Sequence, residues 1–213
     1  MNTTIIGAGN MARGIGTRLA AGGHSVTLVS RDPKAAADTQ TVIQGAAQKG
    51  ATVQVSAWGS PVNGDVVYLA VPYSAVADIA RQYKAQLAGK IVVDLTNPLN
   101  STYDGLATPA DSSAAEEIAR ALPGSRLVKA FNTTFAGTLV KGAVAGLPLD
   151  VYLAGDDAEA KKAIAGQVQD SQLRPIDAGP LQRARQLEGL ALLGITLQFT
   201  QGTQFASAWK FLA

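Results

Sequence analysis

The run TTIIGAGNMARGIGTRLAA, residues 3–21, decides the fold of this 213-residue chain. It reads as a short β-branched strand, a glycine turn and a helix. Gly7 permits the tight turn out of the strand, Gly9 lets the backbone approach a pyrophosphate, and the small Ala12 lets the helix pack closely on the sheet. The first N–H groups of the helix then face the phosphates, where the helix dipole favours negative charge. The pattern predicts a dinucleotide-binding site; the alternative is an ordinary strand-to-helix turn in an α/β protein.

The end of the second expected strand distinguishes NADP from NAD. In an NAD site this strand usually ends in an Asp or Glu that accepts from the ribose 2′-OH, about 20 residues past the glycines. Ser30 and Arg31 stand there instead, and a hydroxyl and a guanidinium can hold a 2′-phosphate by charge-assisted hydrogen bonds. We therefore predict NADP. Asp32 is interpreted as the N-cap of the next helix with Pro33 at its first position, and Lys34 either helps to bind the phosphate or is only solvated.

The composition is that of an ordinary soluble chain, with 47% hydrophobic and 16% charged residues and a net charge of +2. The scattered Lys and Arg residues give no reason to expect nucleic acid or a membrane surface as a partner. Cysteine is absent, which excludes disulfide and thiolate chemistry and fits a reducing compartment, so we expect a cytoplasmic protein. The chain begins directly with a strand, so no signal peptide is expected. The apolar stretch Leu190–Phe199 is too short to span a bilayer.

Short β-branched runs alternate with Ala-rich helical stretches, which is typical of a parallel sheet with crossover helices. The expected strands are Thr3–Ile6, Ser25–Val29, Thr52–Val55, Asp65–Ala70, Lys90–Leu95 and Arg126–Ala130. The expected helices between them are Pro33–Lys49, Tyr73–Leu87 and Ser113–Leu122. We predict a doubly wound parallel (Rossmann) α/β domain over residues 1–134, followed by a small α+β C-terminal extension over residues 135–213.

Ligands of open α/β sheets bind beyond the carboxyl ends of the strands. The fourth strand ends in Ala70-Val71-Pro72, whose small residues let the backbone approach the ribose and nicotinamide while the proline fixes the chain path. At the ends of the fifth and sixth strands, Asn97, Asn132 and Thr133 can supply hydrogen bonds without a charge. The alternative is that these residues only make turns.

Residues for acid–base, nucleophilic or metal chemistry are scarce. The one histidine, His24, falls in a helix-to-strand turn and is interpreted as structural, so neither a Ser-His-Asp set nor a His-x-x-His pair can be assembled. Asp94 is interpreted as a structural acid, and Glu116 and Glu117 as first-turn acids of a helix that begins with the capping box Ser113-x-x-Glu116. Since hydride transfer needs positioning rather than a protein acid or base, we predict no catalytic side chain and no metal.

Several sequence blocks together carry a resemblance to a known family. They are Gly7-Ala8-Gly9-Asn10-Met11, Ser30-Arg31, Val92–Leu99, Val128–Thr134, Ala154–Asp157, Arg174–Leu181 and Ala184–Glu188. Over nearly its whole length the chain resembles the NADPH-dependent reductases of the deazaflavin coenzyme F420 (8-hydroxy-5-deazaflavin:NADP oxidoreductases), including their bacterial relatives. The Phe131-Asn132-Thr133 form differs from archaeal members and resembles bacterial relatives and the reductase domains of membrane ferric reductases.

The resemblance implies an oxidoreductase in which hydride passes between the nicotinamide and a planar ring acceptor, which is coenzyme F420 or a flavin such as FMN or FAD. It implies that the C-terminal portion completes the acceptor pocket and a homodimer. The residues expected to bind NADP(H) are Gly7, Ala8, Gly9, Asn10, Met11, Ser30, Arg31, Lys34, Ala70, Val71, Pro72 and Asn97. The residues expected to meet the acceptor are Pro98, Phe131, Asn132 and Thr133.

The sequence of the C-terminal portion mostly predicts secondary structure and packing. We expect strands at residues 151–154 and 173–176 around a helix capped by Asp156 or Asp157, with Lys161 and Lys162 on its solvated face. A final long helix follows Pro180, and its apolar side is either core or a dimer interface. Two further expectations concern pairs of side chains: Arg185 and Glu188 are spaced for an i,i+3 pair, and Trp209 and Phe211 either anchor the tail or close the pocket.

Two alternative functions remain open. One is an NADPH-dependent imine reductase resembling pyrroline-carboxylate reductases, which share the Gly-Ala-Gly-Asn-Met opening but carry a longer all-helical C-terminal domain. The strand-like segments of this chain weigh against that alternative. The other is a module that senses NADP(H) without turnover.

Overall fold

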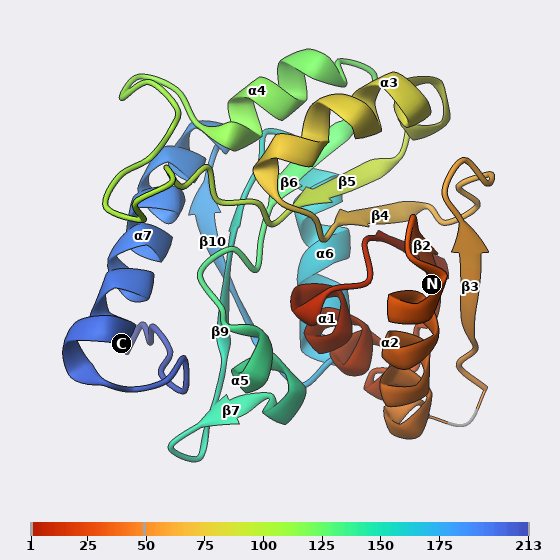
Figure 1. Ribbon diagram of the computed structural model, residues 1–213, viewed down its shortest axis with the longest axis horizontal. Coiled ribbons are helices and arrows are strands. Elements are labelled where there is room, and N and C mark those ends of the chain that lie inside the picture. Colours follow the sequence, from red (N-terminus) through yellow and green to blue (C-terminus); the bar gives the residue numbers. More distant parts are fainter. Residues whose placement is uncertain (1, 49, 213) are drawn as a thin grey trace.

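The computed structural model, which describes residues 2–48 and 50–212, is built on one eight-stranded sheet with helices on both faces (Figure 1). The strand order is β10-β9-β6-β5-β4-β1-β2-β3. The first six strands are β1 (Asn2–Ile6), β2 (Ser25–Ser30), β3 (Val53–Ala57), β4 (Val66–Leu69), β5 (Ile91–Asp94) and β6 (Arg126–Lys129). All neighbours among these six are parallel, which confirms the predicted doubly wound sheet.

All but the last of the helices lie between consecutive strands of the chain, and the last helix follows the final strand. They are α1 (Asn10–Ala21), α2 (Pro33–Ala46), α3 (Val76–Leu87), α4 (Ala114–Ala121), α5 (Ala136–Lys141), α6 (Ala158–Asp170) and α7 (Ala184–Gln201), with short 3₁₀ turns η1 (Tyr73–Ala75) and η2 (Leu181–Arg183). The predicted strands and helices lie within a few residues of observed ones, but α5 and the short strands that follow it were not predicted. The predicted end of the second helix, Lys49, lies outside the described residues. The stretch from Asn97 to Asp111 contains no helix. Helix α1 begins at Asn10, directly after the glycine turn.

The C-terminal strands extend the same sheet. Strand β9 (Asp150–Ala154) lies antiparallel to β6 through the pair Lys129–Ala154, and β10 (Arg174–Gly179) lies parallel to β9. A separate two-stranded ribbon, β7 (Ala143–Val144) and β8 (Leu147–Pro148), precedes them. The boundary at residue 134 remains a prediction.

Each face of the sheet has its own apolar core. Residues of α1, α2 and α6 form one buried cluster, whereas residues of α3, α4 and the start of α7 form the other. On the first face, two buried side-chain hydrogen bonds link α6 to the sheet. Tyr68 Oη donates to Gln167 at 2.8 Å, and Gln167 Nε2 donates to Thr3 Oγ1 at 2.9 Å. These bonds fix α6 against β1 and β4.

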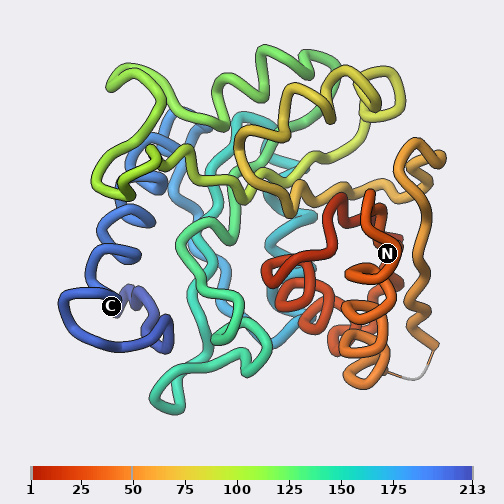
Figure 2. Tube along the Cα trace, in the orientation of Figure 1, coloured from red at the N-terminus to blue at the C-terminus, as the bar shows by residue number. Residues whose placement is uncertain are grey.

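The chain after α7 folds back beside that helix (Figure 2). A Cβ on Gly194 of α7 would lie 2.9 Å from Nε1 of Trp209, so the returning tail lies close against the helix. None of the described helices is both long and apolar enough to cross a bilayer.

Candidate functional site

The glycine turn lies directly against the end of β4. Gly7 has φ +121°, and a Cβ there would come 2.2 Å from the carbonyl oxygen of Ala70, so no other residue fits. Gly9 differs, since nothing lies within 4 Å of the position of its missing Cβ. The turn is therefore packed on its inner side and open on its outer side, where the predicted pyrophosphate would approach.

The N-terminus of α1 is available to an anion. Gly9 is its N-cap and supplies no side chain to cap it, so N–H groups of the first turn, around Asn10 and Met11, are left for a ligand. The turn is held from the other side by Thr39 of α2, whose hydroxyl donates to the carbonyl of Ala8 at 2.8 Å. The structure thus brings Gly7, Gly9 and the start of α1 together as the spacing predicted.

A cavity of about 200 Å³ lies between the glycine turn and the end of β2. Its lining residues are Ile6, Gly7, Val29, Ser30, Arg31, Asp32, Trp58, Val71, Ala75 and Ile79. Most of them are apolar, and Ser30 and Arg31 lie among them. The size and lining are consistent with an adenosine end flanked by a hydroxyl and a cation. Trp58 was not predicted, since it follows β3 outside any motif.

Arg31 is held in place by two neighbours. Its guanidinium lies 4.0 Å above the ring of Trp58 and donates to Asp78 of α3 at 2.9 Å. The hydrogen bond from Arg31 lowers the pKa of Asp78. Lys34 is exposed at the start of α2. Asp32 accepts from the N–H of Ala35 and caps α2, as predicted.

The end of β4 leads towards the predicted position of the nicotinamide ring. Val71 lines the same cavity as Ser30, and Pro72 is exposed before η1. Tyr73 donates its hydroxyl to Glu117, and burial together with this bond raises the pKa of Tyr73 to about 12. Tyr73 therefore stays protonated at neutral pH.

Two amides join the ends of β5 and β6. Asn97 Nδ2 donates to the carbonyl of Asn132 at 2.9 Å, and Asn132 Nδ2 donates to Asn97 Oδ1 at 3.0 Å and to the carbonyl of Leu187 at 2.9 Å. Asn132 is 5% exposed, and its Oδ1 has no hydrogen-bond partner among the described residues. An acceptor is thus left unused where the two strand ends meet.

The predicted acceptor residues Pro98, Phe131, Asn132 and Thr133 are all buried. The Phe131 ring is 2% exposed and packs edge-on against Tyr68. Phe131 has φ +64°, a turn conformation in which its carbonyl accepts from both the N–H and the hydroxyl of Thr134. Its side chain therefore shapes the β6 loop from the core side, and does not reach the surface of the cleft.

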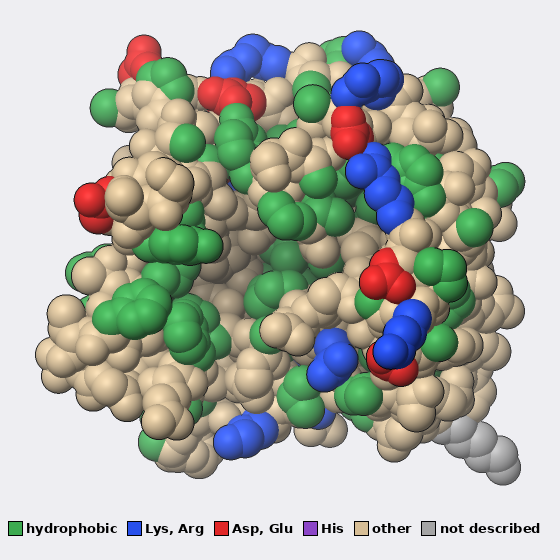
Figure 3. All heavy atoms as spheres, viewed as in Figure 1, with side chains coloured by type: hydrophobic (Ala, Val, Ile, Leu, Met, Phe, Trp, Pro, Cys, Tyr) green, Lys and Arg blue, Asp and Glu red, His purple; other side chains and the backbone are tan. Residues whose placement is uncertain are grey.

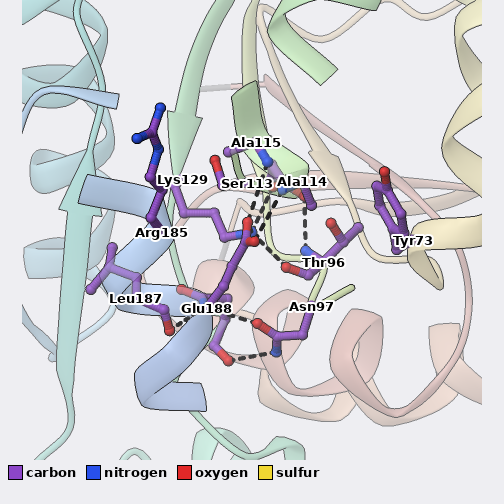
Figure 4. A network of polar contacts seen from close by, with 12 residues as sticks. Tyr73, Thr96, Asn97, Ser113, Ala114, Ala115, Lys129, Arg185, Leu187 and Glu188 are labelled. Carbon is purple, nitrogen blue, oxygen red and sulfur yellow. Dashed lines mark hydrogen bonds and ion pairs between the residues drawn. The ribbon is translucent and has the colours of Figure 1, made fainter. Parts of the chain in front are cut away.

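Behind the amides lies a fully buried ionic network (Figure 4). Lys129 Nζ donates to Asp94 at 2.8 Å, to Glu188 at 2.7 Å and to the carbonyl of Thr96 at 2.5 Å, and all three charged side chains are 0% exposed. The interpretation of Asp94 as structural is confirmed. The pairing of Lys129 with Asp94 and Glu188 was not predicted, although a lysine within the apolar run before Phe131 indicates a buried cation that needs partners.

Glu188 connects this network to α4. Its carboxylate accepts from the N–H groups of Ala114 and Ala115 at 3.0 and 3.3 Å, at the helix end where a negative charge is favoured. The predicted Arg185–Glu188 pair is wrong. Arg185 instead forms two hydrogen bonds with Glu116, at 2.7 and 2.9 Å, because α7 packs against α4 and each charge finds a partner there.

Ser113 is the N-cap of α4, as the capping-box pattern predicts. The Ser113 hydroxyl accepts from the N–H of Glu116 at 3.2 Å and donates to its carboxylate at 2.8 Å. The bond from Arg185 lowers the pKa of Glu116, although burial opposes this. Glu116 thus joins a helix cap to α7.

The remaining predicted residues are structural. His24 is buried and lies 3.2 Å from Asp170. Asp157 caps α6, whereas Lys161 is not on a solvated face, because it pairs with Asp177 at 2.9 Å between α6 and β10. The Phe211 side chain is exposed, but its N–H donates to Asp150 at 2.8 Å and so anchors the tail. Within residues 2–48 and 50–212, no cluster of side chains could hold a metal ion.

Comparisons with known sequences agree with this geometry. Residues 2–98 match the family described as NADP oxidoreductase, coenzyme F420-dependent. The F420-dependent NADP reductase of Methanothermobacter marburgensis is 32% identical over 206 residues, which cover 90% of this chain and 89% of that protein. Metalloreductase STEAP3 of Rattus norvegicus is 35% identical over 191 residues, which cover 88% of this chain and 36% of that protein. This chain therefore corresponds to about a third of the length of that relative.

Solved structures give the same result. A candidate F420-dependent NADP-reductase from Arthrobacter sp. FB24 superposes with a TM-score of 0.83 at 28% identity, covering 99% of both chains. An imine reductase from Bacillus cereus superposes with a TM-score of 0.63 at 19% identity, which shows a shared fold alone. The chain belongs to the family of coenzyme F420-dependent NADP oxidoreductases, and it is an NADP-dependent oxidoreductase.

Proposed function

We propose that the protein transfers a hydride between NADP(H) and a planar ring acceptor, with a deazaflavin of the coenzyme F420 type as the preferred acceptor and a flavin as the second choice. The reduced nicotinamide supplies the hydride when it is bound. The protein then has to bind the dinucleotide, hold the acceptor ring over it and exclude water.

The proposed NADP(H) contacts follow the cleft from one end to the other. The turn from Gly7 to Met11 holds the pyrophosphate, and Ser30 and Arg31 hold the 2′-phosphate, with Lys34 within the same exposed region. Pro72 and Asn97 lie towards the ring end, together with Asn132 and Thr133 on the acceptor side. The open outer side of Gly9 and the uncapped start of α1 support this assignment.

The Asn97–Asn132 pair is the observation that carries the proposal. The strand ends at which a nicotinamide would lie present neutral amides, while the ionisable groups behind them, Asp94, Lys129 and Glu188, are fully buried and paired with one another. Such a site can orient rings by hydrogen bonds, while the ionisable groups behind the amides are held in their own pairs. Hydride transfer between two rings is chemistry of that kind.

The test is oxidation of NADPH by the purified protein, followed at the absorbance band of the reduced nicotinamide. Coenzyme F420, FMN, FAD and pyrroline-5-carboxylate are offered in parallel, and NADH is the control donor. We expect turnover with the deazaflavin and a strong preference for NADPH. Turnover only with FMN or FAD would keep the mechanism and change the acceptor.

Other outcomes would replace the proposal. Turnover with pyrroline-5-carboxylate would favour the imine reductase alternative. Tight NADPH binding without oxidation by any of the four acceptors would favour the sensing module. If the protein does not bind NADPH, the proposed cofactor is wrong.

We also propose that the protein is a homodimer in the cytoplasm. Support for the dimer comes from large apolar side chains exposed on α7 and the tail, among them Leu193, Phe199 and Leu212. Light scattering during size-exclusion chromatography would give twice the monomer mass, and a monomer at micromolar concentration would contradict the proposal. Fractionation of the source cells tests the location.

A further inference from the structure

A second cavity, of about 440 Å³, opens beside the glycine turn. Its lining comes from three distant segments: the start of α1, the start of α5 and the tail after α7. The lining residues are Asn10, Arg13, Phe135, Ala136, Gly137, Val140 and Phe205. Figure 3 shows this face of the molecule, hollowed near its centre between the C-terminal portion and α1. Because Asn10 belongs to the predicted pyrophosphate turn, the cavity adjoins the cofactor cleft.

Arg13 is placed against the usual electrostatic preference. It lies in the first turn of α1, which contains no acidic residue, although a cation near a helix N-terminus is unfavourable. Its Nε is buried and has no hydrogen-bond partner among the described residues. A guanidinium in this position is explained by an anion that binds beside it.

The tail brings an aromatic ring to the same cavity in an unusual backbone conformation. Gln204 and Phe205 have φ +50° and +59°, so two consecutive non-glycine residues are left-handed. Edge contacts with Phe135 and Phe199, at centroid distances of 5.2 and 5.9 Å, hold the Phe205 ring, which is still 42% exposed. Such conformations recur where a segment clamps a ligand.

A neighbouring cavity supplies a second cation. This cavity, of about 380 Å³, also includes Gly137 and Phe205 in its lining, and it adds Lys141 at the end of α5. The two cavities share Gly137 and Phe205, and we call them together the track: Arg13 lines the part beside the cofactor turn, Phe205 lines both parts, and Lys141 lines the part beyond.

We infer that this track binds the anionic arm of the ring acceptor, with Arg13 paired to its phosphate or carboxylate and Phe135 and Phe205 covering the uncharged chain between that anion and the ring. The inference rests on the proposed function. The arm fits better than the NADPH pyrophosphate, because the open N–H groups after Gly9 serve the pyrophosphate, and phenyl rings line the track beyond them.

The experiment compares Arg13→Gln with wild type, using two acceptors that share a ring and differ in their arm. FMN carries a phosphate and riboflavin carries none, and coenzyme F420 and its ring without the anionic arm form a second pair. Arg120→Gln on α4 is the matched control, since it removes the same charge from an exposed position. We expect Arg13→Gln to raise the KM for the acceptors with an anionic arm by about 10- to 100-fold, as for a lost charged hydrogen bond.

The KM for the arm-less acceptors and the Kd for NADPH should stay within about twofold in Arg13→Gln, because these acceptors lack the anion that pairs with Arg13 and NADPH lies outside the track. Arg13→Lys should restore part of the effect, and Phe205→Ala should raise the KM for both the neutral and the anionic acceptors. A loss of NADPH affinity in Arg13→Gln would assign Arg13 to the pyrophosphate and overturn the inference. Equal effects on FMN and riboflavin would overturn it as well. If wild type oxidises NADPH with none of these acceptors, the proposed function fails instead, and fluorescence titration with FMN still tests the track.

Discussion

The two ends of the candidate site use charge in opposite ways. At the adenosine end, Arg31 and Asp78 form an ion pair whose side chains are 56% and 42% exposed. At the proposed ring end, the side chains of Lys129, Asp94 and Glu188 are completely buried, and Glu188 also accepts from two N–H groups at the start of α4. An exposed ion pair contributes little free energy, so its charges can rearrange to bind a ligand. Buried charges hold helices and strands together, so the groups that contact a ligand there are the neutral amides.

The largest effect should come from the buried end. Lys129→Met leaves two carboxylates buried without their cation, which costs about 3–5 kcal/mol of unfolding free energy. Chemical denaturation measures this change. Glu188→Gln is the matched variant, because it keeps the acceptor for the α4 N–H groups and leaves Lys129 with Asp94; it should cost less. A loss of unfolding free energy below about 1 kcal/mol in Lys129→Met would show that the buried network does not hold β5, β6 and α7 together.

A second buried acid gives a pH-dependent effect. Burial of Asp150 opposes its ionisation, but hydrogen bonds from Arg174, Lys210 and the Phe211 N–H outweigh it and lower the pKa of Asp150 to about 2. The ionised form therefore stabilises the fold fully above the ordinary value of 3.8, and this stabilisation is lost as pH falls from 3.8 through about 2. Asp150→Asn should be less stable than wild type at pH 7 and approach it below pH 3. Parallel stability curves for the two proteins would contradict this.

At the exposed end the effect should appear in binding and leave stability nearly unchanged. Arg31→Ala removes the cation proposed to hold the 2′-phosphate, so the Kd for NADPH should rise by about 10- to 100-fold while the Kd for NADH changes little. Isothermal titration with both dinucleotides measures the ratio. The idea fails if both affinities fall equally. Thermal unfolding should shift by less than about 2 °C.

The smallest effect concerns the partner of Arg31. Asp78→Asn removes a carboxylate that competes with a phosphate for the guanidinium but also helps to position it. Because the pair is exposed, we expect a change of only a few-fold in NADPH affinity, with a stronger dependence on salt concentration than in wild type. Trp58→Leu, which removes the ring beneath Arg31, is the companion variant. A large loss in Asp78→Asn alone would mean that positioning outweighs competition.

Local sequence signals predicted most of the fold. The strand, glycine turn and helix at residues 3–21, the Asp32 cap with Pro33, and the Ser113 cap of α4 depend on neighbours within a few positions, and each was found as predicted. The side-chain partners were less predictable. Arg185 and Glu188 are spaced for each other on one helix, yet each pairs with a residue far away in the sequence.

The sequence by itself determined the dinucleotide turn, the parallel sheet and the family, because these depend on short-range spacing and on the alternation of apolar runs. Only the tertiary structure showed that Phe131 turns inwards, that Lys129 joins β5, β6 and α7, and that Arg13 and Phe205 line one cavity beside the glycine turn. The physical reason is that burial and charge pairing are decided between segments. Residues such as Arg13 and Phe205, nearly the whole chain apart, share no local pattern that records the cavity they line together.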